Sequence, residues 1–165
     1  MTSPSHEDNI RLEAAEGWLG LGDWQEASLE LAQIDPELET LPRVIELRYK
    51  ICGAAHRWEE AAELARAIGR RLPEHPWGHF HLAFALHELK RTTEAYQTLR
   101  AVVDQFPADW LMRFNLACYA CQLGNLEEAM AWLAKAVTLA DRESIRDMAL
   151  QDQDLQPLWA KIREL

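Results

Sequence analysis

Apolar residues recur along the chain at the spacing that is typical of α-helices. Between residues 110 and 123 they lie mostly three or four positions apart, at Leu111, Phe114, Leu116, Ala117, Ala120 and Leu123. Between residues 126 and 140 one face carries Ala129, Leu133, Ala136, Val137 and Ala140. The dipeptide Gly124-Asn125 separates these stretches and is typical of a helix end that needs a left-handed residue. We therefore predict two helices joined by a short turn.

This pattern recurs along the chain at a constant interval. Four alanines form one evenly spaced column, at Ala27, Ala61, Ala95 and Ala129. The hexapeptides that end at these alanines line up as GDWQEA, HRWEEA, KRTTEA and GNLEEA. Pro73 and Pro107 are separated by the same interval, and we expect each to end the second helix of its unit. A period of about 34 residues, held over three intervals, predicts an array of stacked helix pairs.

These features together resemble the tetratricopeptide repeat (TPR) family. The resemblance implies an all-α fold, a right-handed α-solenoid of four TPR-like helix–turn–helix units with a C-terminal cap. The units would span residues 8–41, 42–75, 76–109 and 110–143, with the cap at 144–165. We expect residues 1–165 to form a single TPR domain.

The chain departs from the family pattern at three places. Pro36 comes about three residues early, so the second helix of the first unit should be short and its connection irregular. His56 and Lys90 occupy the turn positions that are glycine in the outer units. Tyr49 occupies a column that is otherwise Ala15, Ala83 and Ala117, which predicts looser or shifted packing between units one and two.

The C-terminal segment has the pattern expected of a cap. Ser144 and Asp154 are candidate N-caps of two short helices. Leu155, Leu158, Trp159 and Ile162 form one apolar stripe, which suits the inner face of a terminal element. The alternative is a removable segment that occupies the groove or swaps between chains.

The resemblance places the first helix of each unit on a concave, partner-binding surface. Units three and four would present an aromatic patch there, which we expect to be accessible to solvent. The candidate groove residues are Lys50, Trp77, Phe80, His81, Phe84, His87, Leu111, Phe114, Asn115 and Cys118. A fitting ligand is an amphipathic helix or an extended segment with apolar anchors. The alternative is that the tail or a neighbouring unit covers these aromatics.

One binding mode of the family does not fit. Some relatives clamp the C-terminal carboxylate of heat-shock chaperones with Lys, Asn and Arg at fixed groove columns. Lys50 and Asn115 are at most isolated remnants of such a set, and Glu16 or Glu46 would repel a carboxylate.

Composition narrows the function classes. The chain has 165 residues, 48% of them hydrophobic, and a net charge of −10. Such an acidic balance argues against nucleic acid and anionic membranes as partners. The sequence has no long apolar run and no basic, apolar start, so we expect a cytoplasmic protein. We find no catalytic motif or converging set of catalytic roles, and we expect neither enzymatic activity nor a cofactor.

Cys118 and Cys121 form a CxxC motif in the middle of a predicted helix. Redox motifs of this kind lie at a helix N-terminus, and a structural zinc site needs four ligands, of which His87 could be a third. We therefore interpret both cysteines as packing residues rather than metal ligands. The leading hypothesis is a module that binds a partner protein. The alternatives are a self-assembling homodimer and a metal or redox role for the two cysteines.

Overall fold

The computed structural model describes residues 3–164, which are helical and contain no β-strand. The α-helices of this range are α1 (His6–Gly20), α2 (Trp24–Leu31), α3 (Pro42–Ala54), α4 (Trp58–Arg71), α5 (Pro76–Glu88), α6 (Thr92–Arg100), α7 (Trp110–Gln122), α8 (Leu126–Leu139), α9 (Arg142–Gln151) and α10 (Trp159–Ile162). Three short 3₁₀ helices lie between them, η1 (Pro36–Leu38), η2 (Val103–Gln105) and η3 (Gln153–Leu158). The all-α prediction is confirmed.

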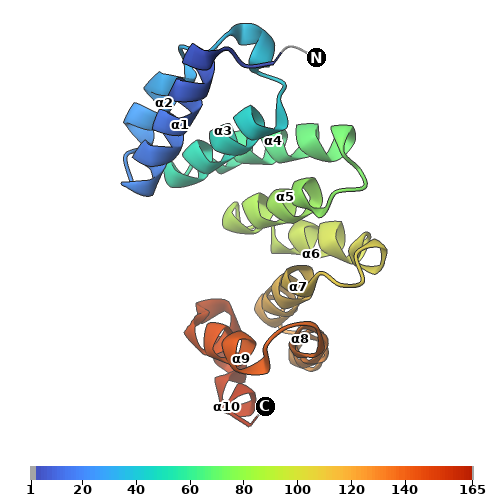
Figure 1. Ribbon diagram of the computed structural model, residues 1–165. Coiled ribbons are helices and arrows are strands. Elements are labelled where there is room, and N and C mark those ends of the chain that lie inside the picture. The colour runs from blue at the N-terminus through green and yellow to red at the C-terminus, as the bar shows by residue number, and fades with distance from the viewer. Residues whose placement is uncertain (1–2, 165) are drawn as a thin grey trace. The chain divides into compact units, whose positions relative to one another are not determined.

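The chain divides into two compact units, and the boundary falls inside α5. The first unit ends at Ala85 and the second begins at Leu86. In the first unit, α1 and α2 form one antiparallel pair and α3 and α4 form the next (Figure 1). Its main core joins these pairs through Leu12, Ala15, Ala27, Leu31, Val44 and Leu47, all of them buried.

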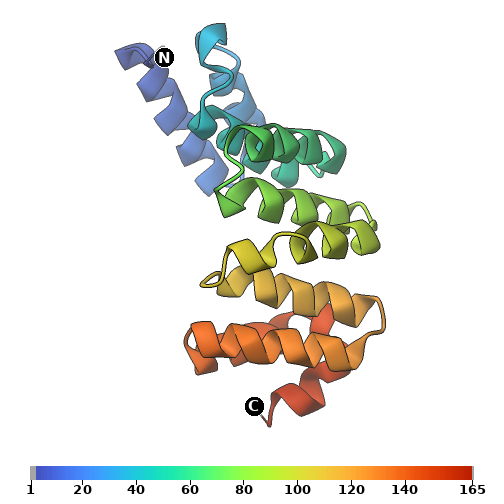
Figure 2. The same cartoon turned by 90° about the vertical axis from the view of Figure 1, so that its right-hand side faces the viewer.

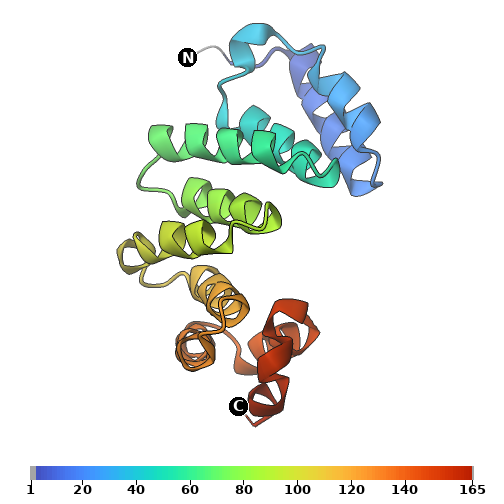
Figure 3. The ribbon, with the colours of Figure 1, turned by 180° about the vertical axis from the view of Figure 1, so that it is seen from behind.

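In the second unit, α7 and α8 form the central antiparallel pair, and α6 packs against α7 (Figure 2). The C-terminal elements α9, η3 and α10 gather beside this pair (Figure 3). Ile145, Leu155, Leu158 and Ile162 supply their inner faces and are almost fully buried. The C-terminal segment therefore covers the apolar surface of the last helix pair, as a cap does.

The turns inside the four helix pairs share one geometry. Gly22, His56, Lys90 and Gly124 all adopt a positive φ, between 55° and 83°. After each of them, the next N–H donates to the carbonyl oxygen five residues earlier, for example from Arg57 to Cys52 at 2.8 Å. This is the Schellman ending, which needs a left-handed residue. His56 and Lys90 adopt that conformation without being glycine, so each carries strain that Gly22 and Gly124 avoid.

The repeat period is visible in the packing. Helices α3, α5 and α7 begin at Pro42, Pro76 and Trp110, which are spaced by the same interval as the repeated alanines. All four alanines of that column have 0% exposed surface. A side chain no larger than a methyl group lets the two helices of a pair approach closely at this column.

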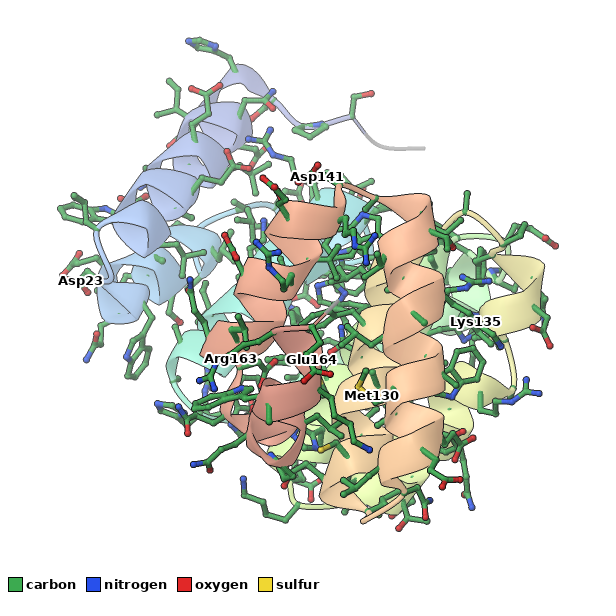
Figure 4. The ribbon with its side chains drawn as sticks, turned by 90° about the horizontal axis from the view of Figure 1, so that it is seen from below. Asp23, Met130, Lys135, Asp141, Arg163 and Glu164 are labelled. Carbon is green, nitrogen blue, oxygen red and sulfur yellow. The ribbon has the colours of Figure 1, made fainter. Side chains whose placement is uncertain are left out.

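Several sequence-based expectations about helix ends are wrong. The second helix of the third pair, α6, ends at Arg100 rather than at Pro107, and η2 follows it. The N-cap of α9 is Asp141, which Figure 4 labels at the start of this helix. Its side chain accepts a hydrogen bond from the backbone N–H of Ser144. The N-cap of η3 is Asp152, which accepts from the backbone N–H of Asp154. In both cases the acidic residue two or three positions earlier takes the capping role.

The expectation for the first pair is confirmed. Helix α2 has only eight residues, and η1 begins at Pro36 in the connection to α3. Of the helices in residues 3–164, none is long and apolar enough to cross a membrane.

Candidate interaction surface

Helix α5 carries an aromatic stripe, defined here as Trp77, Phe80, His81 and Phe84. These positions are three, four and seven residues apart, so the side chains share one face of the helix. All four are only partly buried. The other sides of the helix carry Gly78, Ala83, Ala85 and Leu86, which are buried, and His79 and Leu82, which are partly exposed. Packing therefore covers the sides of the helix unevenly and leaves the aromatic rings partly exposed.

Tyr49 on α3 packs against the stripe. Its side chain is buried, and its hydroxyl group donates a hydrogen bond to the backbone oxygen of His81 at 3.0 Å. Its ring meets the rings of Trp77 and His81 edge-on, with centroids 5.3 and 4.6 Å apart. The bulky residue in the small-residue column thus fills the space between α3 and α5 and links the two helices. Sequence reasoning singled out Tyr49 only as a misfit.

Within the stripe, the rings of Trp77 and His81 are stacked, with centroids 4.0 Å apart and planes 10° apart. The ring nitrogen Nδ1 of His81 lies 3.0 Å from the backbone oxygen of Trp77. A carbonyl oxygen only accepts, so Nδ1 carries the proton, and Nε2 of the neutral ring is an acceptor. Burial lowers the pKa of His81 to about 4, so the stripe is uncharged at neutral pH.

At the other end of the stripe, Phe84 meets Trp58 of α4 edge-on, with ring centroids 5.7 Å apart. Near Trp77, the first unit contains a hollow of about 180 Å³ lined by Pro42, Glu46, Ile68, Leu72, His75 and Trp77. Its lining is largely apolar and includes the carboxylate of Glu46 and the imidazole of His75. Such a hollow suits one apolar side chain of a ligand.

A charged margin lies beside the stripe on α3. Lys50 is exposed and pairs with Glu46 at 2.9 Å. Arg43, at the start of the same helix, pairs with Glu16 of α1 at 3.1 Å. Between α1 and α3 there is a second hollow of about 430 Å³, lined by Glu16, Leu19, Gly20, Leu47, Lys50 and Ala54. The predicted groove residue Lys50 therefore borders a hollow, but a carboxylate already neutralises it.

In the second unit, the residues that we predicted on α7 differ in exposure. Leu111 and Asn115 are half-buried, and the amide of Asn115 donates to the backbone oxygen of Leu111. Phe114 and Cys118 are 4% and 3% exposed. The expectation that Phe114 is accessible is therefore wrong, because this side chain belongs to the packed interior.

The C-terminal segment explains part of this burial. Its acidic turn, at Asp152 and Asp154, lies against α7 and the end of α5. The thiol of Cys118 donates to Asp152 at 3.5 Å, and Gln122 donates to the backbone oxygen of Asp154 at 3.0 Å. His87 lies 2.8 Å from the carboxylate of Asp154, and its side chain is only 12% exposed. The predicted groove residues His87 and Cys118 are thus in contact with the tail.

The same surroundings suppress the reactivity of the thiols. Burial is the main cause that raises the pKa of Cys118 and of Cys121, and Asp152 and Asp154 raise both further. A thiol with a raised pKa is a weak nucleophile and a weak metal ligand at neutral pH. Over the part of the chain that the structure describes, no three His, Cys, Asp or Glu side chains are grouped to hold a metal ion.

Antiparallel helix pairs that repeat at a constant interval, with a left-handed residue in each turn and a small residue at each crossing, define a helical-repeat protein. Two tetratricopeptide repeat models match the sequence, one at residues 54–111 and the other at 112–142. These stretches adjoin and cover more than half of the chain. The chain belongs to the tetratricopeptide repeat family.

Solved structures share the fold. One described as the MamA RS-1 ArsTM double mutant has a TM-score of 0.71 and 16% identity, over 98% of this chain and 96% of that one. A second, of Podosopora anserina putative kinesin light chain TPR-like repeats, has a TM-score of 0.68 and 21% identity, over 97% and 96%. A third, MamA MSR-1, has a TM-score of 0.65 and 19% identity, over 82% and 78%. No curated protein sequence matches the chain.

Proposed function

We propose that this chain is a protein-interaction module that captures an apolar segment of a partner protein on the aromatic stripe of α5. The observation that carries the proposal is the alignment of four partly exposed rings on one face of a helix that other elements pack against. Aromatic anchors on a rigid element are the side chains that contribute most to binding at interfaces.

The chemistry of the stripe indicates the kind of segment that it would bind. Its rings offer apolar surface, and the hollow next to Trp77 accepts one apolar side chain. His81 is neutral and offers Nε2 as an acceptor for a backbone or side-chain N–H of the ligand. The ligand would therefore be an amphipathic helix or extended segment with apolar anchors, and not a segment that docks through negative charge.

The proposal differs from the groove that the sequence suggested. The stripe and the adjacent Lys50 remain candidates, whereas Leu111 and Asn115, although partly exposed, belong to the second unit and are not part of this site. Phe114 and Cys118 are left out because they are buried, and His87 because it contacts the tail.

The experiment that tests the proposal is selection of random peptides from a phage-display library on the immobilised protein. The test variant is Phe80→Glu, since Phe80 is partly exposed and its ring contacts only another member of the stripe, His81, among the aromatic contacts described. The matched control is Leu123→Glu, which adds the same charge at an exposed position just after α7. Circular dichroism and thermal unfolding establish that both variants are folded.

We expect the selected peptides to share aromatic or aliphatic anchors. Their affinity should fall at least about tenfold for Phe80→Glu and stay unchanged for Leu123→Glu. Equal loss in both variants, or no loss in either, would exclude the stripe as the binding site. Light scattering with gel filtration covers the homodimer alternative: a dimer that Phe80→Glu converts to a monomer would show that the stripe pairs two copies.

A further inference from the structure

The first helix pair exposes an unusual amount of apolar surface. Among residues 3–164, the most exposed large apolar side chains are Leu21 at 79%, Leu29 at 57% and Ile10 at 53%. Trp18 is also exposed. Ile10, Trp18 and Leu21 belong to α1 and its C-cap, and Leu29 belongs to α2.

The apolar residues of α1 form two faces. Leu12 and Ala15 point into the core of the first unit, where they meet α2 and α3. A second set, Ile10, Ala14, Gly17, Trp18 and Leu21, is spaced by four, seven, eight and eleven residues and therefore shares a different face. We call this set the outer face of α1. Its members are exposed or half-buried, so the first unit leaves this face uncovered.

Two exposed acidic residues lie beside the outer face. Glu7 lies at its N-terminal end and Glu13 along its edge, and both are exposed. Arg11 is the only Lys or Arg in residues 1–41, and it pairs with Glu7 at 3.7 Å and with Glu30 of α2 at 2.9 Å. Residues 1–41 contain ten Asp and Glu against this one arginine, which gives the segment a formal charge of −9 out of −10 for the whole chain.

We infer that the outer face of α1 docks a basic amphipathic helix, one whose apolar side is flanked by Lys or Arg. Apolar surface of this extent at helical spacing marks an interaction site. Charge complementarity selects the partner, since an acidic margin attracts a basic helix and repels an acidic one. A second copy of this chain is a poor occupant, because pairing two outer faces brings two strongly acidic segments together. The outer face lies on α1 and the aromatic stripe on α5, so this inference does not depend on the proposed function.

The test uses a short amphipathic helical peptide made only of leucine and lysine, labelled for fluorescence anisotropy. A peptide with glutamate in place of lysine is the charge control. The protein variant is Ile10→Glu/Leu21→Glu, and its matched control is Leu126→Glu/Leu139→Glu, which changes two exposed apolar residues of α8 to the same acid.

We expect the leucine–lysine peptide to bind the wild type and the α8 control equally well, and Ile10→Glu/Leu21→Glu at least about tenfold more weakly. The two added glutamates would by their charge strengthen the attraction of the protein for the basic peptide. Weaker binding would therefore identify the apolar face as the site. Tighter or equal binding by Ile10→Glu/Leu21→Glu would overturn the inference, since it would show that the peptide does not bind through the apolar outer face. A concentration-dependent dimer that this variant abolishes would overturn it in favour of a second copy.

Discussion

At the scale of single residues, His81 shows how position decides chemistry. Its ring is stacked on Trp77, lies edge-on to Tyr49 and donates to a backbone oxygen. Burial is the largest cause of its lowered pKa, while the hydrogen bond to Trp77 and the charge of Glu46 raise the pKa and Lys50 lowers it. The imidazole therefore acts as an aromatic packing group with one acceptor, and not as a cation.

His81 should make the stability of the protein depend on pH. Its pKa is about 4 in the folded chain and about 6.5 in the unfolded chain, so the unfolded state binds more protons between these values. The free energy of unfolding therefore contains the full contribution of neutral His81 above about pH 6.5, and this contribution is lost as the pH falls toward 4. We expect up to about 3 kcal/mol of the free energy of unfolding to be lost through this group.

Urea unfolding of the wild type and of His81→Gln at several pH values from neutral down to the pKa of His81 measures this effect. Carboxylates titrate in both proteins, so the difference between the two curves isolates the histidine. Curves that run parallel over the whole range would contradict the assignment.

At the scale of helices, the close crossing of α4 and α5 requires that Gly78 has no side chain. A Cβ atom added to Gly78 would lie 2.5 Å from the Cα and the N of Gly69 and 3.1 Å from the oxygen of Ala65. These are backbone atoms, so the helices would have to move apart. A Cβ atom on Gly69 would meet Gly78 at an ordinary 3.8 Å.

The two glycines should therefore respond in opposite directions to the same substitution. We expect Gly78→Ala to lower the free energy of unfolding by about 2 kcal/mol or more through overpacking. Gly69→Ala should be neutral or raise it by up to about 1 kcal/mol, because alanine favours the helix over glycine. Chemical denaturation of both variants gives the comparison, and a cost at Gly69 equal to that at Gly78 would show that the close crossing is not the cause.

The tail elements α9, η3 and α10 make both apolar and polar contacts with the rest of the second unit. Their apolar stripe closes the core of the second unit. Their acidic turn also occupies the face of α7 that carries Cys118, and it holds His87. Trp159 fixes the turn by donating its ring N–H to the backbone oxygens of Ala149 and Asp152. A ligand that reaches Cys118 would have to displace this segment.

For the molecule as a whole, charge is distributed unevenly along the chain. Residues 1–41 carry −9, and residues 42–165 are nearly balanced at −1. Mutual repulsion among the acids of the first helix pair lowers the stability of the compact state, and dissolved salt screens it.

Removing one acidic charge should therefore stabilise the protein only where these charges are concentrated. We expect Glu13→Gln to raise Tm by about 1–3 °C in dilute buffer and by less in molar salt. Glu74→Gln, at an exposed position outside this segment, should give no gain. Thermal unfolding at low and high salt checks both, and a gain at Glu13 that does not depend on salt would rule out charge repulsion as its cause.

The sequence by itself determined the helix pairs, their period and the family. These properties are local: apolar spacing within a helix, a left-handed residue at each turn and a small residue at each crossing all act between neighbours in the chain. The short length of α2 could be predicted from Pro36, because a proline also acts locally. The helix caps could be read only roughly, because Asp141 and Ser144 compete for one role within a single turn.

Only the tertiary structure decided which apolar residues are covered. Phe114 and Phe80 have the same spacing pattern in their helices, yet the first is buried and the second is partly exposed. Burial depends on contacts between residues far apart in the sequence, such as Tyr49 with His81 and Cys118 with Asp152. Helical periodicity places a side chain on a face, but the elements packed against that face decide whether it can bind a partner.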